Sequence, residues 1–447
     1  MSAVGAAADA AADAAADAAA GGAADVAADV AADTLAAGTS RPDGDLTAWS
    51  GGRVVLPLAV VDGHAVLTEG DRIVAVVRQG DVPSTARTEE LRGAYLAPGL
   101  IDIHTHGALG VSFLDGDDEA FKTILEEQAR RGVTGLLATT STAPLPAILA
   151  ALETTRSWQE PGRPGTRVLG AHVEGPYFAA AQAGAQDPAH LRTPDDGSVD
   201  RLLEHADVIR IVSFAPELPG AVELTRRLVD LGIVAAGGHS EASDDELHRL
   251  EAYGLSHMIH LWSGQSTTFR RGAYRVPGIL EASLASATLT GEIISDGKHL
   301  PPTLLRLAYR AFGPERLCVV SDATSGAGLA DGSPFSMGEM SYVVKDGVGM
   351  MPDGSAFAGS STLLDGMLKV LTKQVGLPLH EVVRMASLTP ATVIGLGDRK
   401  GSLAPGKDAD LAVFSPELEP LKTVIAGRSV WSRAGDVATP KKERDRS

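Results

Sequence analysis

The segment Pro98-Gly99-Leu100-Ile101-Asp102-Ile103-His104-Thr105-His106-Gly107 decides the fold of this chain. Its run at 100–103 is mostly apolar and predicts a buried strand, which ends at two histidines and a glycine. Alternate side chains of a strand point to the same face, so His104 and His106 project together. A buried strand that ends in His-x-His is typical of a metal site at the mouth of a barrel or sheet. Two histidines can also fall this close by chance, so the pair alone leaves both interpretations open.

The overall composition is typical of a soluble globular enzyme. The chain has 447 residues, of which 44% are hydrophobic and 21% charged, enough for a large barrel and a smaller domain. No apolar run reaches the roughly 18 residues that span a bilayer. The net charge of −18 disfavours nucleic acid and anionic membranes as partners. Cys318 is the only cysteine, which excludes an intramolecular disulfide and indicates a reducing cytoplasm.

The two ends of the chain differ from its middle. Residues 1–50 are rich in Ala and Asp and have too few large apolar side chains for a core, so they predict a disordered tail, as the polar residues 436–447 also do. Short strand signals with tight turns occupy 51–96 and return at 399–435. We expect these two parts to join into one small β-sandwich built from both chain ends.

Strand and helix patterns alternate through residues 97–398. This alternation predicts an α/β fold, a (β/α)8 barrel of the TIM type. Helical spacing of apolar residues falls between several of the strands, for example at 119–131 and 302–311. The eight strands are expected at 100–104, 134–139, 167–174, 208–214, 233–239, 257–260, 287–296 and 317–322.

Polar residues gather where the predicted strands end. Barrel enzymes carry their active sites at the C-terminal ends of the strands. Of the twelve histidines in the chain, six occupy such ends, accompanied by acidic residues. This group comprises His104, His106, His172, Glu174, His239, His260, Asp296, His299 and Asp322.

Several motifs make the chain resemble the amidohydrolase superfamily and, within it, the N-acetylglucosamine-6-phosphate deacetylases. The most specific are His172-Val173-Glu174-Gly175-Pro176 and Ala215-Pro216-Glu217, while the block at 401–410 is common to the wider superfamily. The resemblance extends from about residue 52 to residue 431. It implies hydrolysis of N-acetylglucosamine 6-phosphate to glucosamine 6-phosphate and acetate, in amino-sugar catabolism and cell-wall sugar recycling.

The resemblance also implies a divalent metal, with zinc expected and iron, cobalt or manganese as alternatives. Glu174, His239 and His260 match the ligands of the catalytic metal. His104 and His106 match a pair that binds a second metal in some members, with the glutamate bridging; alternatively they only support the surroundings of the first metal. One or two ions per subunit therefore both remain open.

The same resemblance assigns the proton-transfer residue and the substrate contacts. Asp322 matches the aspartate that takes a proton from the attacking water and gives one to the departing amine. Arg275 stands in an Arg-x-Pro-Gly motif whose arginine reaches a phosphate, often across a dimer interface, so a homodimer is implied. His299 matches a histidine that contacts the sugar.

Two departures from the family pattern concern the sugar pocket. Ser263-Gly264 replaces the usual Asn-Ala pair, and Gln186 replaces the histidine of a Gly-Ala-His motif. We expect Ser263, Gly264 and Gln186 to contact the substrate in a rearranged way. The departures favour, as an alternative, deacylation of another N-acyl amino sugar such as N-acetylgalactosamine 6-phosphate. A non-catalytic sugar-phosphate-binding relative would require a broken metal set, which this chain does not have.

Overall fold

The computed structural model of the chain describes residues 46–433. The predicted polar tail at 436–447 and residues 1–45 of the predicted N-terminal tail lie outside the described residues. Residues 46–50, which the sequence interpretation included in that tail, instead form strand β1 (Leu46–Ser50). The boundary at residue 50 is therefore wrong, because Ala48 and Trp49 are buried in a sheet that begins before it.

Eight parallel strands form the barrel, and their order in space follows their order in the chain. This confirms the predicted (β/α)8 class. Nearly every strand residue is buried, because helices cover the outside and side chains fill the inside. The strands are β8 (Leu100–Thr105), β11 (Val133–Thr140), β12 (Arg167–Glu174), β13 (Ile209–Phe214), β14 (Val234–Gly237), β15 (His257–Met258), β18 (Thr290–Ile294) and β19 (Leu317–Val320).

The barrel closes between its first and last strands. Thr105, the last residue of β8, forms a parallel bridge with Ala323, just beyond β19. The Asp322 amide donates a hydrogen bond to the His104 carbonyl at 2.8 Å. Closure therefore brings two chemically active residues together that are far apart in the sequence.

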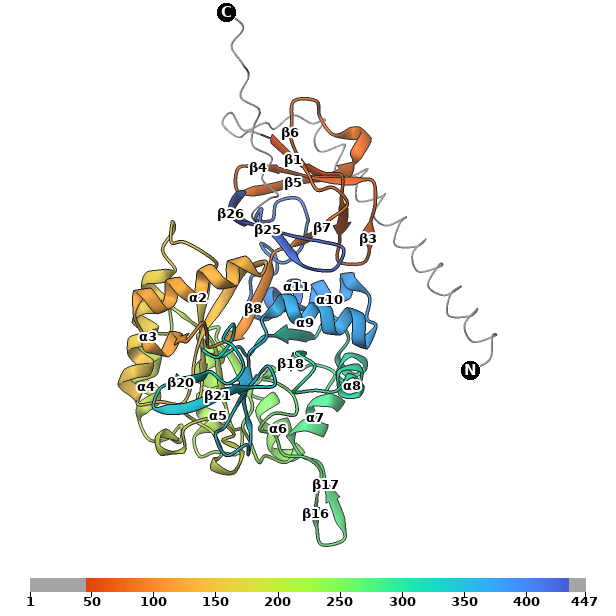
Figure 1. Cartoon of the computed structure of the whole chain (residues 1–447). Helices are drawn as coiled ribbons and strands as arrows, with labels where there is room; N and C mark the ends of the chain where they lie inside the picture. Colours follow the sequence, from red (N-terminus) through yellow and green to blue (C-terminus); the bar gives the residue numbers. More distant parts are fainter. Residues whose placement is uncertain (1–45, 434–447) are drawn as a thin grey trace, which may run out of the picture.

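Helices surround the barrel, as Figure 1 shows. A representative helix is α2, which begins after Asp117, whose carboxylate accepts a hydrogen bond from the Ala120 amide. Its buried residues Phe121, Ile124 and Leu125 recur at helical spacing and face the strands. The helices are α2 (Asp118–Arg130), α3 (Leu145–Trp158), α4 (Ser198–Leu203), α5 (Ala221–Asp230), α6 (Asp244–Glu251), α7 (Ile279–Ala285), α8 (Pro302–Phe312), α9 (Leu364–Val370), α10 (Leu379–Met385) and α11 (Leu388–Val393).

Two further sheets lie at one end of the barrel and draw on both ends of the chain. One has the order β5-β4-β1-β6, and the other has the order β26-β25-β24-β7-β2-β3, so that antiparallel pairing of β24 with β7 joins the two chain ends. The strands are β2 (Arg53–Val55), β3 (Val60–Val61), β4 (His64–Glu69), β5 (Arg72–Arg78), β6 (Arg87–Glu90), β7 (Tyr95–Pro98), β24 (Leu411–Phe414), β25 (Pro420–Ile425) and β26 (Arg428–Ser432).

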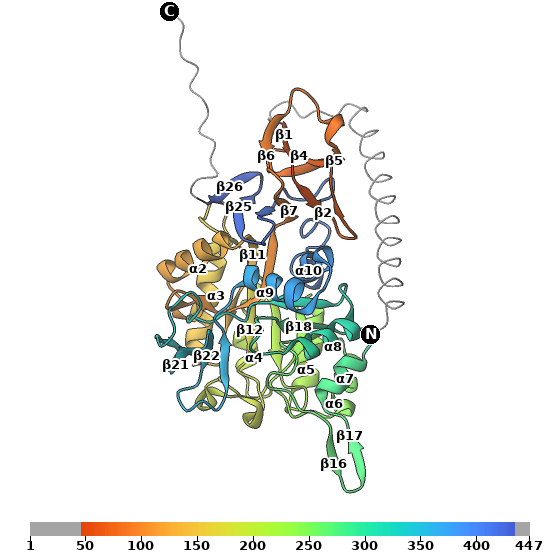
Figure 2. The ribbon, with the colours of Figure 1, turned by 45° about the vertical axis from the view of Figure 1, so that its right-hand side comes forward.

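The barrel strands end on the side away from these sheets. Strand β7 leads directly into β8, which runs from the sheets into the barrel (Figure 1). A hairpin of β16 (Phe269–Arg271) and β17 (Tyr274–Val276) projects at the opposite end of the molecule in Figures 1 and 2. Within residues 46–433, no helix has the length and apolar character that a membrane crossing requires.

The sequence did not predict the antiparallel sheet inserted between β19 and α9. Its strands are β20 (Pro334–Met337), β21 (Met340–Lys345), β22 (Val348–Met350) and β23 (Phe357–Ser360). A bridge between Ala323 and Ser360 attaches this sheet to the end of β19, so it lies at the mouth of the barrel.

Candidate active site

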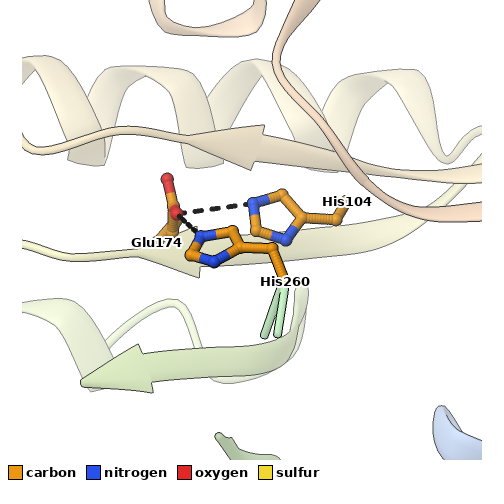
Figure 3. A group of neighbouring side chains, drawn as sticks. All are labelled: His104, Glu174 and His260. Carbon is orange, nitrogen blue, oxygen red and sulfur yellow. Dashed lines mark hydrogen bonds and ion pairs between the residues drawn. The ribbon is translucent and has the colours of Figure 1, made fainter. Parts of the chain in front are cut away.

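Four imidazoles converge on the carboxylate of Glu174 at the end of β12. The distances to its Oε1 atom are 3.0 Å from His260 Nε2, 3.3 Å from His239 Nε2 and 3.5 Å from His104 Nε2, while His106 Nε2 lies 3.4 Å from Oε2. Figure 3 shows the carboxylate facing the rings of His104 and His260. The fold therefore brings together all five residues that the sequence predicts as metal ligands.

Asp322 lies on the β19 side of this cluster. Its Oδ1 atom is 3.2 Å from His106 Nε2 and 3.6 Å from His104 Nε2. The backbone φ angles of Asp322 and His239 are both +44°, a left-handed conformation that residues other than glycine seldom adopt. Such strain persists where the surrounding structure fixes a side chain in a functional direction.

The two carboxylates of the cluster are held in the ionised form. Burial raises the pKa of Glu174, but the neighbouring imidazoles of His104, His239 and His260 outweigh burial and lower the pKa well below its usual value. Burial also raises the pKa of Asp322, but the hydrogen bond from His106 and the charge of His104 outweigh burial and lower the pKa below its usual value. Both side chains can therefore bind cations or accept a proton.

His104 has the opposite shift. Burial lowers its pKa, but the negative charges of Glu292 and Glu174 outweigh this and raise the pKa well above the ordinary value. A proton and a metal ion compete for the same ring nitrogen, so metal binding here would release a proton.

The donor set fits a divalent metal. His104, Glu174 and His260 have ligand atoms within 4.8 Å of one another, and so do His104, His106 and Asp322. Within the described part of the chain, His104 Nε2 is buried without a hydrogen-bond partner, although it faces two carboxylates. Carboxylate oxygen and neutral imidazole are the ligands of zinc and of similar transition metals.

A pocket opens above the cluster, lined by Glu174, Asp322 and most of the predicted substrate residues: Ser263, Gly264, Gln186 and His299. Gln186 is already engaged, because its side-chain amide donates to Glu174 Oε2 at 2.5 Å and accepts from the Thr142 amide at 2.7 Å. It therefore orients the central carboxylate as well as facing the pocket.

Arg275 is not among the residues that line this pocket. It lies on β17 of the projecting hairpin and is exposed. The structure therefore does not bring Arg275 to the pocket of its own subunit.

Three groups of site residues were missed by the sequence interpretation. Glu292 is fully buried in β18 and bonds His104, and Asp102 is fully buried in β8 and bonds Ser321. The signal for both was a carboxylate within an apolar strand. Burial raises the pKa of Asp102 to about 7, although hydrogen bonds from Ser321 oppose the shift.

Met337, Ala356 and Phe357 of the inserted sheet form a wall of the pocket.

Comparison with known proteins places the chain among hydrolases with this fold. The sequence model of the amidohydrolase family matches residues 95–430. The N-acetylglucosamine-6-phosphate deacetylase of Vibrio furnissii is 32% identical over 381 residues, which cover 83% of this chain and 94% of that protein. The N-acetylgalactosamine-6-phosphate deacetylase of Escherichia coli O157:H7 is 31% identical, with coverage of 82% and 95%.

A solved structure supports the same assignment. The crystal structure of N-acetylglucosamine-6-phosphate deacetylase from Pasteurella multocida is 29% identical, has a TM-score of 0.80 and covers 87% of this chain and 100% of that chain. The chain therefore belongs to the amidohydrolase family, and within it to the N-acetylglucosamine-6-phosphate deacetylases, as its motifs indicated.

Gly264 gives a testable steric prediction. Its φ is +58°, and a Cβ there would lie 2.6 Å from His239 Nδ1 and 3.0 Å from the Gln182 carbonyl oxygen, two atoms that form a 2.7 Å hydrogen bond. Gly264→Ala should break this bond and turn the His239 ring. Mass spectrometry should then detect less bound metal, and the free energy of unfolding should fall by about 1–3 kcal/mol.

Gly184→Ala is the matched control. Its φ is +59°, and its Cβ would lie 3.7 Å from His239 Cε1, an ordinary contact. This variant has similar backbone strain but should keep its metal. Equal metal content in the two variants would contradict the steric explanation.

Proposed function

We propose that this chain hydrolyses the acetamide of N-acetylglucosamine 6-phosphate to glucosamine 6-phosphate and acetate, in amino-sugar catabolism and cell-wall sugar recycling. The observation that carries the proposal is the convergence of Glu174, His239, His260 and Asp322 beside a pocket, in a chain of the deacetylase family. A reducing cytoplasm is its proposed location, supported by the single buried cysteine, Cys318.

The five ligand residues divide into two sets in this proposal. Glu174, His239 and His260 would hold the catalytic ion, for which zinc is our proposal and iron, cobalt and manganese are the alternatives. His104 and His106 would hold a second ion together with Glu174. A bound metal supplies a Lewis acid that polarises the amide carbonyl and promotes deprotonation of water.

Asp322 is the proposed proton-transfer residue. Its carboxylate is ionised, faces the pocket and has its position fixed beside His106. It accepts a proton from the attacking water as the water oxygen bonds to the carbonyl carbon. When the C–N bond breaks, Asp322 gives a proton to the amine nitrogen. The products are acetate and the free amino sugar.

The proposed sugar contacts come from the pocket walls. His299 Nδ1 lies 2.8 Å from Asp296 Oδ2, so the ring is fixed and its Nε2 atom is available to a sugar hydroxyl. Ser263, Gly264 and Gln186 line the same space. We further propose that Arg275 binds the phosphate of the partner subunit's substrate in a homodimer, because its hairpin projects away from its own subunit (Figure 2).

A second substrate is favoured by one feature of the pocket. Ser263 has a shorter side chain than the asparagine usual in the family, and the space this leaves could accept an epimeric sugar. A relative named for N-acetylgalactosamine 6-phosphate is nearly as similar to this chain as those named for the glucosamine substrate.

A panel of four sugars tests the substrate. Purified enzyme of known metal content is assayed with N-acetylglucosamine and N-acetylgalactosamine, each with and without the 6-phosphate. We expect the largest kcat/KM for N-acetylglucosamine 6-phosphate. A larger value for the galactosamine epimer would replace the first proposal by the second, and no release of acetate from any of them would refute both.

Asp322→Asn tests the proton-transfer role. The amide cannot accept the proton, so kcat should fall by about 10²–10⁴-fold while bound metal is retained. Asp365→Asn, which changes a buried aspartate beside Arg131 outside the pocket, should retain activity if the protein folds. Near-normal turnover by Asp322→Asn at full metal content would remove Asp322 from this role.

Arg275→Ala tests the phosphate contact. A charge-assisted hydrogen bond contributes about 1.5–3 kcal/mol, so KM should rise roughly tenfold or more for the phosphorylated sugar and hardly change for the unphosphorylated one. Arg310→Ala, at an exposed position of α8, is the control. An equal change in KM for both sugars would exclude a phosphate contact.

Mixed dimers show whether the Arg275 that contacts the phosphate belongs to the same subunit as the active site or to the partner subunit. A dimer of one Arg275→Ala subunit and one Asp322→Asn subunit contains a complete site only if the arginine acts across the interface. Activity recovered on mixing supports that arrangement, and absence of recovery in a demonstrated mixed dimer contradicts it.

A further inference from the structure

Glu292 is a buried carboxylate that has no part in the proposed reaction. It lies in β18 with 0% exposure, next to the apolar Ile293. Burial of an ionised carboxylate costs several kcal/mol unless its oxygens are paired. An apolar residue would fill a purely structural position here without that cost, so the contacts of the carboxylate need an explanation.

Those contacts go to the metal cluster. Glu292 Oε2 lies 2.7 Å from His104 Nδ1 and accepts a hydrogen bond from the His260 backbone amide at 3.2 Å. Its other oxygen lies 3.1 Å from His257 Nε2, and His257 Nδ1 lies 2.6 Å from Thr290 Oγ1. The carboxylate is thus fixed from two sides and in turn fixes the ring of His104.

This contact decides which nitrogen of His104 faces the cluster. An ionised carboxylate only accepts hydrogen bonds, so the ring places an N–H on Nδ1 toward Glu292. The Nε2 atom is then directed at Glu174 Oε1, 3.5 Å away, and Asp322 Oδ1, 3.6 Å away. In metal sites, a ligating histidine usually donates a hydrogen bond from one ring nitrogen to a carboxylate, and its other ring nitrogen binds the ion.

His106 has no comparable support. Its Nδ1 atom is buried and has no hydrogen-bond partner within residues 46–433. A second ion bound by His104 and His106 would therefore depend mainly on His104, whose ring Glu292 holds in place.

We propose that Glu292 is a positioning residue that orients His104 for the second of the two proposed metal ions. This inference rests on the proposed metal site, in which His104 and His106 would hold the second ion. Glu292 touches neither the substrate nor the reacting atoms. Its effect is on the affinity of one ion and not on the chemistry at the other.

Metal binding to Glu292→Gln tests the proposal without any substrate. The amide retains the size of the side chain but loses the charge and one acceptor atom. Calorimetric titration of the metal-free protein with zinc should show two ions on the parent and a second affinity lowered by about 10–100-fold in the variant. Mass spectrometry after equilibration at a fixed free zinc concentration should give two ions on the parent and one on the variant.

Two further variants calibrate the result. Glu127→Gln alters another buried carboxylate, which pairs with Arg131 at 2.8 Å outside the cluster, and should still bind two ions. His104→Ala removes the ligand itself and should bind one. If Glu292→Gln does not fold, Glu292→Asp retains the charge with a shorter reach and should also weaken the second ion selectively.

The outcomes separate this proposal from the proposed reaction. A parent that binds only one ion, a Glu292→Gln variant that binds two with parental affinity, or an equal loss of both ions would each overturn the positioning role. None of these results depends on turnover. Two ions on the parent and one on the variant, with no acetate released from any of the four sugars, would refute the deacetylase function and leave the positioning role intact.

Discussion

The carboxylate of Glu174 is the constraint on which the rest of the site depends. It is 1% exposed, and a buried charge of this kind is tolerated only when its oxygens are paired. The imidazoles around it come from the ends of β8, β14 and β15 or just beyond them. Those ends meet only when the barrel is assembled, so the stability of the fold and the geometry of the site are coupled.

A second layer of buried carboxylates extends this coupling. Asp102 Oδ2 accepts a hydrogen bond from Ser321 Oγ at 2.5 Å and so ties β8 to β19 beside Asp322. Glu292 connects β18 to His104 in the same way. Side chains that are themselves held by neighbours keep a site within the narrow tolerance that catalysis requires. The carboxylates that support the site therefore lie on strands of the barrel core.

Much of this arrangement could be predicted from the sequence because barrel strands have a simple pattern. Apolar runs located the eight strands, and polar residues at their ends located Glu174, His239 and Asp322. The sequence pattern could not assign a partner to Glu292, because a polar residue inside a strand does not reveal which residue it contacts across the barrel. The strands β20–β23 are short and partly exposed, so their signal is weak, and the clash at Gly264 exists only between segments brought together by folding.

The inserted sheet has an evolutionary consequence. Its residues Met337 and Phe357 border the pocket, whereas the proposed ligands and Asp322 come from the ends of the barrel strands. Mutations in the insertion can therefore reshape what the pocket admits while the inherited reaction centre is preserved. Such a division lets selection explore new acyl sugars in small steps, each starting from an enzyme that still works.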